Sequence, residues 1–155
     1  MKIQRMKNKQ KGFSLIELLI VVAIILIIAA IAIPNLLRSK MAANEASAVG
    51  SMRTINTSAV AYSTTYGTYP AALTDLGPST APTSTAADLI DSVLAAGTKS
   101  GYSFSYTVGT GNESYSLTGD PVSSSTGQRH FYTDQSGVIR YNLTTTATSA
   151  DNPLS

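Results

Sequence analysis

One uninterrupted apolar segment near the start of the chain constrains its fold more than any other feature. Every residue from Leu18 to Ile33 is Leu, Ile, Val or Ala, and five cations precede the segment, at Lys2, Arg5, Lys7, Lys9 and Lys11. Counted from Phe13, the segment has about 20 residues, the length that a helix needs to span a hydrocarbon layer of ~30 Å. We therefore expect a membrane-spanning helix whose basic flank stays cytoplasmic, because cations near a span favour that side.

The segment contains a single acidic residue, Glu17, near its N-terminal end. A carboxylate at the centre of a membrane helix costs about 2.5–3.5 kcal/mol on insertion scales, and less near an end. A buried charge without a partner is very unfavourable, whereas a matched pair recovers most of the cost and fixes register. The sequence therefore predicts that Glu17 has a partner of opposite charge.

Two simpler interpretations of the segment remain open. A secretory signal peptide is one, since Ala30-Ile31-Ala32 is an A-x-A pattern behind an apolar core. The acid at Glu17 and the length of the run are evidence against it. The other is a plain signal anchor that holds an exported binding module, in which case Gly12 and Glu17 have no special role.

The start of the chain resembles the N-terminus of a type IV pilin or a related pseudopilin. The residues that carry the resemblance are Gly12-Phe13-Ser14-Leu15-Ile16-Glu17, with the basic leader before them and an apolar run broken by Pro34 behind them. The match is dense over residues 9–40. It implies that a membrane-embedded prepilin peptidase cuts between Gly12 and Phe13 and methylates the new N-terminus at Phe13. It also implies that neighbouring subunits use Glu17 during assembly.

The resemblance also implies an overall organisation and a function. We expect an α+β protein in four parts: a leader at 1–12, a transmembrane and filament-core helix at 13–34, its amphipathic continuation at 35–65, and a globular head at 66–155. The protein would wait in the inner membrane, contact lipid and the assembly platform, and then polymerise with copies of itself into a surface type IV pilus. The alternative is the major pseudopilin of a type II secretion system, in a periplasmic pseudopilus.

The pattern after Pro34 predicts that one helix continues from about Phe13 to about Thr64, interrupted or bent at the proline. Apolar residues recur there on one face at spacings of three, four or seven: Leu37, Met41, Ala48, Met52, Ile55, Ala59 and Tyr62. We expect these residues in the core of the head. Four charged residues are expected off this face: Arg38, Lys40, Glu45 and Arg53.

The rest of the chain predicts a small antiparallel sheet. A short helix is expected from Ala86 to Ala96, with Leu89, Val93 and Leu94 inward and Gly97 as its cap. Alternation and turn residues then predict about four strands, at 101–108, 114–118, 129–133 and 138–143. The Thr-rich remainder from Thr144 is expected to be a mobile tail.

The composition favours neither catalysis nor nucleic-acid binding. Cysteine is absent and the single histidine, His130, lies in a predicted strand, so we expect no catalytic group and no cofactor. Removing the five leader cations from the net charge of +2 leaves side chains that sum to −3, without a basic patch. Asp120, Asp134 and Asp151 are weak candidates for calcium ligands, although Asp120 and Asp134 are better explained as turn residues.

Overall fold

The computed structural model describes residues 12–154, so the basic leader before Gly12 lies outside the described residues. The chain forms two compact units, one that ends at Leu36 and one that begins at Leu37. We call the described part of the first unit the rod (residues 12–36) and that of the second the head (residues 37–154). Each is described by itself.

Helix α1, Leu15–Tyr66, supplies nearly all of the rod and the first element of the head. Its bounds lie within two residues of the predicted ones. The helix ends where Gly67 adopts a positive φ of 84° and donates its N–H to the carbonyl of Ser63 at 2.8 Å. Pro34 lies inside the helix, which is not interrupted there. The bend at Pro34 stays a prediction.

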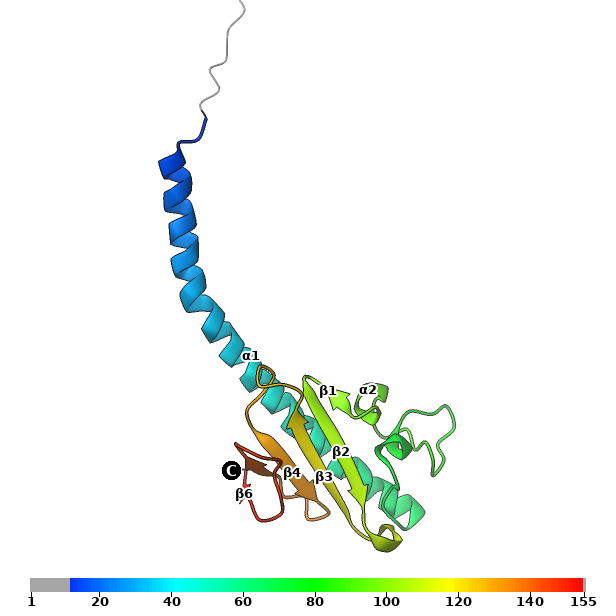
Figure 1. The fold of residues 1–155 in the computed structure, drawn as a ribbon. Coiled ribbons are helices and arrows are strands. Elements are labelled where there is room, and N and C mark those ends of the chain that lie inside the picture. The colour runs from blue at the N-terminus through cyan, green and yellow to red at the C-terminus, as the bar shows by residue number, and fades with distance from the viewer. Residues whose placement is uncertain (1–11, 155) are drawn as a thin grey trace, which may run out of the picture. The chain divides into compact units, whose positions relative to one another are not determined.

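The head contains a six-stranded antiparallel sheet in sequence order (Figure 1). The strands are β1 Thr98–Lys99, β2 Tyr102–Val108, β3 Tyr115–Pro121, β4 His130–Asp134, β5 Arg140–Asn142 and β6 Asn152–Pro153. The α+β prediction is confirmed, and the four predicted strands are the four central ones, with shifted bounds. The sheet has two strands more than the approximate number predicted, because the two edge strands have two residues each, too few to show alternation.

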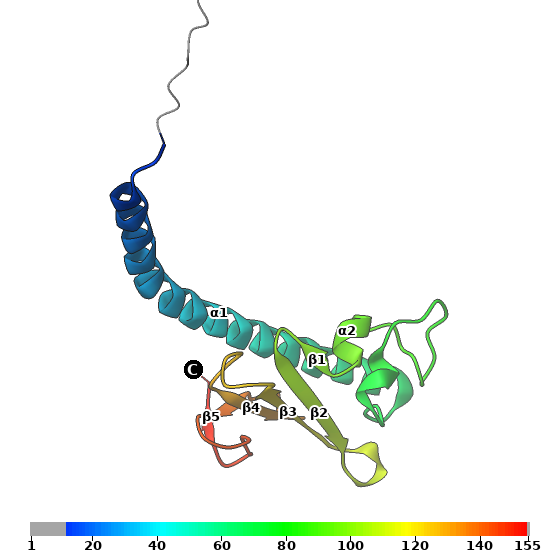
Figure 2. The ribbon, with the colours of Figure 1, turned by 45° about the horizontal axis from the view of Figure 1, so that its top comes forward.

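The core of the head lies where α1 covers one face of this sheet (Figure 2). Five of the seven predicted helix positions are buried: Ala48, Met52, Ile55, Ala59 and Tyr62. Leu37 was wrongly predicted, since its side chain is 48% exposed and the buried face of α1 begins only at Glu45. Gly119 on β3 permits the close approach, because a Cβ there would lie 3.3 Å from the Met52 sulfur.

The predicted helix over 86–96 is mostly absent. Helix α2 covers only Ser92–Ala95, and a short 3-10 helix, η1 Leu73–Leu76, lies before it. The N–H groups of Ala87 and Leu89 donate to carbonyls of η1 at 2.8 and 2.9 Å, so this stretch pairs with η1 rather than coiling. Two residues predicted inward, Leu89 and Val93, are therefore exposed, whereas Leu94 is buried.

The predicted free tail from Thr144 is also wrong. The chain makes a loop and returns to the sheet as β6, where the N–H of Leu154 donates to the carbonyl of Ile139 at 2.7 Å. Asn142 closes the loop by donating its side-chain N–H to an Asp151 carboxylate oxygen at 2.8 Å. A hydrogen bond between residues nine apart leaves no periodic pattern in a sequence.

Candidate assembly segment and polar contacts of the head

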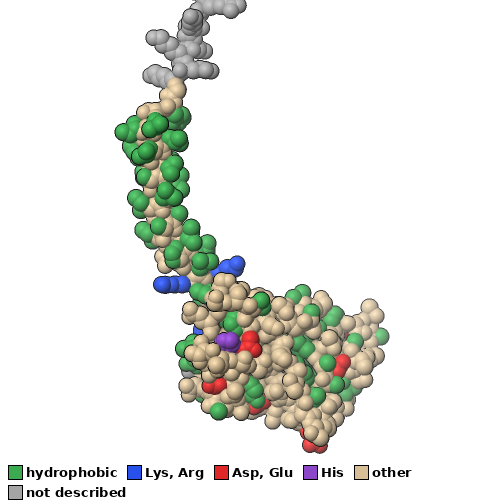
Figure 3. Space-filling view, viewed as in Figure 1, with side chains coloured by type: hydrophobic (Ala, Val, Ile, Leu, Met, Phe, Trp, Pro, Cys, Tyr) green, Lys and Arg blue, Asp and Glu red, His purple; other side chains and the backbone are tan. Residues whose placement is uncertain are grey.

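The rod exposes its apolar side chains on all sides. Each Leu, Ile and Val from Leu15 to Ile33 is at least 46% exposed, and these side chains cover the rod in Figure 3. An 18-residue window of α1 has a mean hydropathy of 3.3, and no other described helix is long and apolar enough to cross a membrane. Burying one such side chain is worth about 1.5–3 kcal/mol. The rod therefore requires lipid or other protein around it.

The residues at the predicted cleavage site lie ahead of the helix. Gly12 and Phe13 are exposed and non-helical, and Phe13 is 89% exposed. A Cβ at Gly12 would meet no atom within 4 Å. A peptidase therefore finds open backbone at this bond, although cleavage and methylation stay predictions.

Glu17 lies in the first turn of α1, on the exposed surface of the rod. Its carboxylate accepts a hydrogen bond from the backbone N–H of Ser14 at 2.8 Å, which satisfies one of the free N–H groups at a helix start. Sequence reasoning missed this local contact. The donor is a backbone N–H group without charge, however. The chain has no Lys or Arg between Gly12 and Leu37. The charge of Glu17 therefore has no side-chain counter-ion within the rod.

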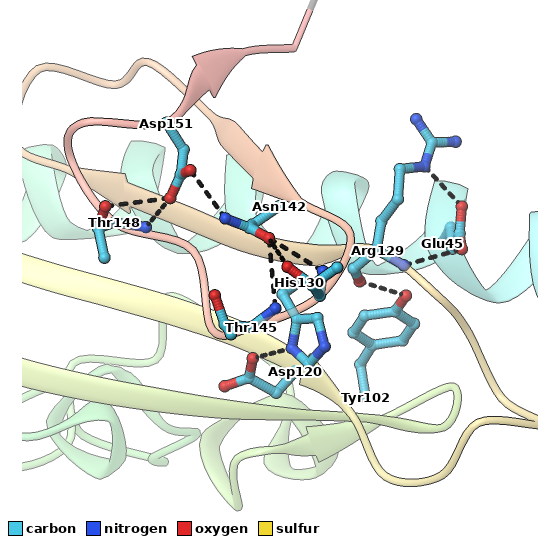
Figure 4. A network of polar contacts seen from close by, with 10 residues as sticks. Glu45, Tyr102, Asp120, Arg129, His130, Asn142, Thr145, Thr148 and Asp151 are labelled. Carbon is cyan, nitrogen blue, oxygen red and sulfur yellow. Dashed lines mark hydrogen bonds and ion pairs between the residues drawn. The ribbon is translucent and has the colours of Figure 1, made fainter.

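Glu45 connects α1 to the start of β4 (Figure 4). It is only 7% exposed, and its carboxylate accepts from the backbone N–H groups of Gln128 and Arg129 at 2.9 and 3.2 Å. The Arg129 Nε also donates to it, at 2.7 Å. The prediction that Glu45 faces away from the core was wrong. The helical spacing could have predicted that Glu45 lies on the buried face, because Glu45 follows Met41 by four residues and precedes Ala48 by three.

These contacts set the pKa of Glu45. Burial by itself raises the pKa of this carboxyl group, because it disfavours the charged form. The hydrogen bonds from Gln128 and Arg129, together with the charge of Arg129, outweigh burial and hold the pKa below its ordinary value. Glu45 is therefore a charged anchor between the helix and the sheet.

A buried polar cluster joins α1 to β3 and β4. The Tyr115 hydroxyl donates to the Asn56 side-chain oxygen at 2.9 Å, and the Asn56 amide donates to the Thr133 hydroxyl at 2.9 Å. Burial raises the pKa of Tyr115 to about 12, so the hydroxyl stays protonated and can donate. The cluster fixes the position of the helix on the sheet.

The candidate calcium ligands lie in separate hydrogen-bonded positions. Asp120 on β3 contacts the His130 Nδ1 on β4 at 2.5 Å, and Asp134 accepts from the Ser136 N–H at 2.9 Å within a turn. Asp151 belongs to the loop contact with Asn142. Within residues 12–154, no three His, Cys, Asp or Glu side chains gather in a way that could hold a metal ion. Asp120, Asp134 and Asp151 therefore stay weak candidates for calcium ligands.

An exposed apolar helix joined to a compact α+β head defines a class of protein. Its described residues offer surfaces for packing, and the rod can be covered only by lipid or by other protein chains. The chain therefore combines one helix that needs lipid or other protein around it with one compact head.

Comparison with known proteins specifies this class. Residues 7–33 match the prokaryotic N-terminal methylation motif. The chain is 42% identical over 57 residues to the type IV major pilin protein PilA of Myxococcus xanthus, covering 37% of this chain and 26% of that protein. It is 56% identical over 52 residues to a type IV major fimbrial protein FimA of Dichelobacter nodosus, covering 32% and 33%. No solved structure gives a significant match.

A third relative is the type IV wide pilus major component PilA4 of Thermus thermophilus, 66% identical over 35 residues, which cover 23% of this chain and 27% of that protein. The chain thus spans about a quarter to a third of the length of these curated relatives. The N-terminal region of the chain is thus similar to that of type IV major pilins and fimbrial proteins, and it carries the N-terminal methylation motif.

Proposed function

We propose that this chain is the precursor of a major structural subunit of a type IV pilus. The observation that carries the proposal is the rod, whose apolar side chains are exposed on all sides and whose residues 12–33 belong to the match with the methylation motif. Two chemically suitable environments can cover such a surface. Lipid covers it before assembly, and the same surface of other copies covers it in a fibre.

The leader and the cleavage site give the order of events. Five leader cations keep the N-terminus cytoplasmic, so the head faces away from the cytoplasm. A prepilin peptidase then cuts between Gly12 and Phe13 and methylates the amine of Phe13. The processed subunit leaves the inner membrane at an assembly platform and enters a surface fibre.

Glu17 is the acid that pairs with a neighbouring copy in this proposal. Cleavage creates an ammonium group at Phe13, and the chain offers no other cation before Arg38, which lies about 32 Å from Glu17 along the helix. In the separate subunit the carboxylate of Glu17 accepts from the Ser14 N–H. In the fibre it pairs with the amine of an axially shifted copy, and this pairing of buried charges sets the stagger.

Mass spectrometry of sheared surface fibres tests this function. We expect the chain in the fibre fraction, starting at Phe13 and one methyl group heavier than the cleaved sequence. A chain that keeps Met1 to Gly12, or one that starts after Ala32, overturns the proposal and favours an anchor or a signal peptide.

A variant at the cleavage site provides the matched comparison. Gly12→Val adds a side chain where no atom lies within 4 Å, so the fold of the chain is unaffected. We expect the uncut chain to accumulate in the membrane and the fibres to disappear. Normal cleavage of this variant would show that the peptidase does not recognise Gly12.

The major pseudopilin of a type II secretion system is the second candidate, since it would use the same rod. The names of the relatives, which are pilus and fimbrial components, favour the pilus. Fibres at the cell surface that retract support the pilus, whereas a periplasmic fibre that is required for protein secretion supports the pseudopilus.

A further inference from the structure

The head has unpaired cations at the end where α1 enters it. Arg38 and Lys40 lie in the first turn of the head's part of the helix, and both are exposed. Neither forms an ion pair within residues 12–154. Other charges near this end are already matched, including Glu45 with Arg129 at 2.7 Å. We call Arg38 and Lys40 the cationic end.

The opposite end of the head contains acids without cations. Glu113 lies in the turn between β2 and β3, and the N–H of Tyr69, just past the end of α1, donates to the neighbouring Asn112 carbonyl at 2.9 Å. Asp75 lies in η1, which follows α1, and its charge acts on Tyr62 in the last turns of the helix. Glu113 is exposed and makes no ion pair within the described residues. We call Asp75 and Glu113 the acidic end.

The two ends are too far apart to pair within one head. The helix from Arg38 to Tyr66 is about 42 Å long at 1.5 Å per residue. At physiological ionic strength charges are screened beyond about 8 Å. Figure 3 shows Lys and Arg atoms where α1 enters the head, whereas Asp and Glu atoms lie at several places on the head, including its far end. Each end therefore needs a partner outside its own chain.

We propose that Arg38 and Lys40 of one copy contact Asp75 and Glu113 of a second copy, head to tail. The inference rests on the proposed function, because parallel copies that share an axis present the cationic end of one head to the acidic end of another. A contact between two different surfaces of the same subunit is the type that builds open helical fibres. Complementary charge at such a contact steers association and excludes wrong registers.

Charge reversal and charge exchange test the contact in cells that produce the full chain. The first variant is Arg38→Glu with Lys40→Glu, and the second is Glu113→Lys with Asp75→Asn, which keeps an oxygen that can accept the Ala72 N–H. The measurement is the ratio of chain in sheared fibres to processed chain in the membrane. We expect each variant to lower this ratio about tenfold, and the combined variant to restore most of it.

Arg53→Glu is the matched control, since Arg53 is an exposed, unpaired cation in the middle of the head's helix. It is expected to leave the ratio within about twofold of wild type. Unchanged ratios in both test variants overturn the contact. A loss on reversing the cations that the combined variant does not restore also overturns it, and indicates anionic lipid headgroups as the partner. Wild-type chain absent from fibres overturns the proposed function itself.

Discussion

The two parts of helix α1 use the same kinds of residue in opposite ways. In the rod, every Leu, Ile and Val from Leu15 to Ile33 is at least 46% exposed. In the head, the apolar residues of the helix that face the sheet, such as Met52 and Ile55, are fully buried. The difference shows where each part finds its partner. The head contains its own partner, the sheet, whereas the partner of the rod must come from outside the chain.

This comparison predicts different effects for substitutions in the rod and substitutions in the head. A change in the rod should leave the head folded and act on assembly, because the head is a compact unit that begins at Leu37 and has its own core. A change in the core of the head should act on the free energy of unfolding. The expected effects follow, from the largest to the smallest.

Glu17→Val should abolish fibres or lower their yield by more than about tenfold, since an unpaired amine then remains in the apolar fibre core. Processing and membrane insertion should stay normal, because valine makes the segment more apolar. Immunoblots of the sheared and membrane fractions measure both. Glu17→Asp, which keeps the charge, is the control and should retain part of the yield. A wild-type yield of fibres from Glu17→Val would contradict the role of the Glu17 carboxylate in assembly.

Phe131→Ala should destabilise the head by about 3–5 kcal/mol. The ring is fully buried, and its centroid lies 5.7 Å from that of Tyr102 in the core. Denaturant unfolding of the full chain in detergent measures the effect. Val93→Ala, at a side chain that is 54% exposed, should change the free energy by less than about 0.5 kcal/mol. Equal effects of the two variants would contradict the described core.

Tyr115→Phe should cost about 1–3 kcal/mol in the free energy of unfolding, because the buried oxygen of Asn56 loses its donor. The same unfolding experiment measures it. Tyr66→Phe removes a hydroxyl from an exposed tyrosine of α1 and is the matched control, with no measurable effect expected. A neutral result for Tyr115→Phe would show that the cluster does not hold the helix on the sheet.

Glu45 should make the head less stable in acid. Its pKa is lower in the folded head than the ordinary value of 4.5, so its stabilisation is complete above pH 4.5 and is lost as the pH falls through the folded pKa. We expect the difference in unfolding free energy between wild type and Glu45→Gln to be about 1 kcal/mol at pH 7 and to shrink in acid. A difference that does not change with pH would contradict a charged Glu45.

Sequence patterns were sufficient to predict those elements that have a regular spacing of apolar residues or a strongly apolar composition. The apolar run of the rod identifies a helix, and the helical spacing from Ala48 to Tyr62 and the alternation in β2 each identify an element and its buried side. The resemblance at Gly12 to Glu17 agrees with the match of residues 7–33 to the N-terminal methylation motif. These signals depend on neighbours close in sequence, and local pattern is what a single sequence contains.

Long-range contacts explain what the sequence did not reveal. Residues 87–90 pair with η1 rather than form a helix, and β6 depends on a loop that Asn142 and Asp151 hold closed. Glu45 was predicted to lie off the apolar face of the helix, whereas hydrogen bonds from residues more than 80 positions later make its burial favourable. Such partners become visible only when the chain is folded.

A three-dimensional reconstruction of the purified fibre by electron cryo-microscopy tests the central claim most directly. We expect residues 15–33 of many copies to pack together along the fibre axis, with the amine of Phe13 within about 4 Å of the Glu17 carboxylate of a neighbouring copy. A fibre in which these residues stay exposed, or in which Glu17 faces no amine of another copy, would contradict the account.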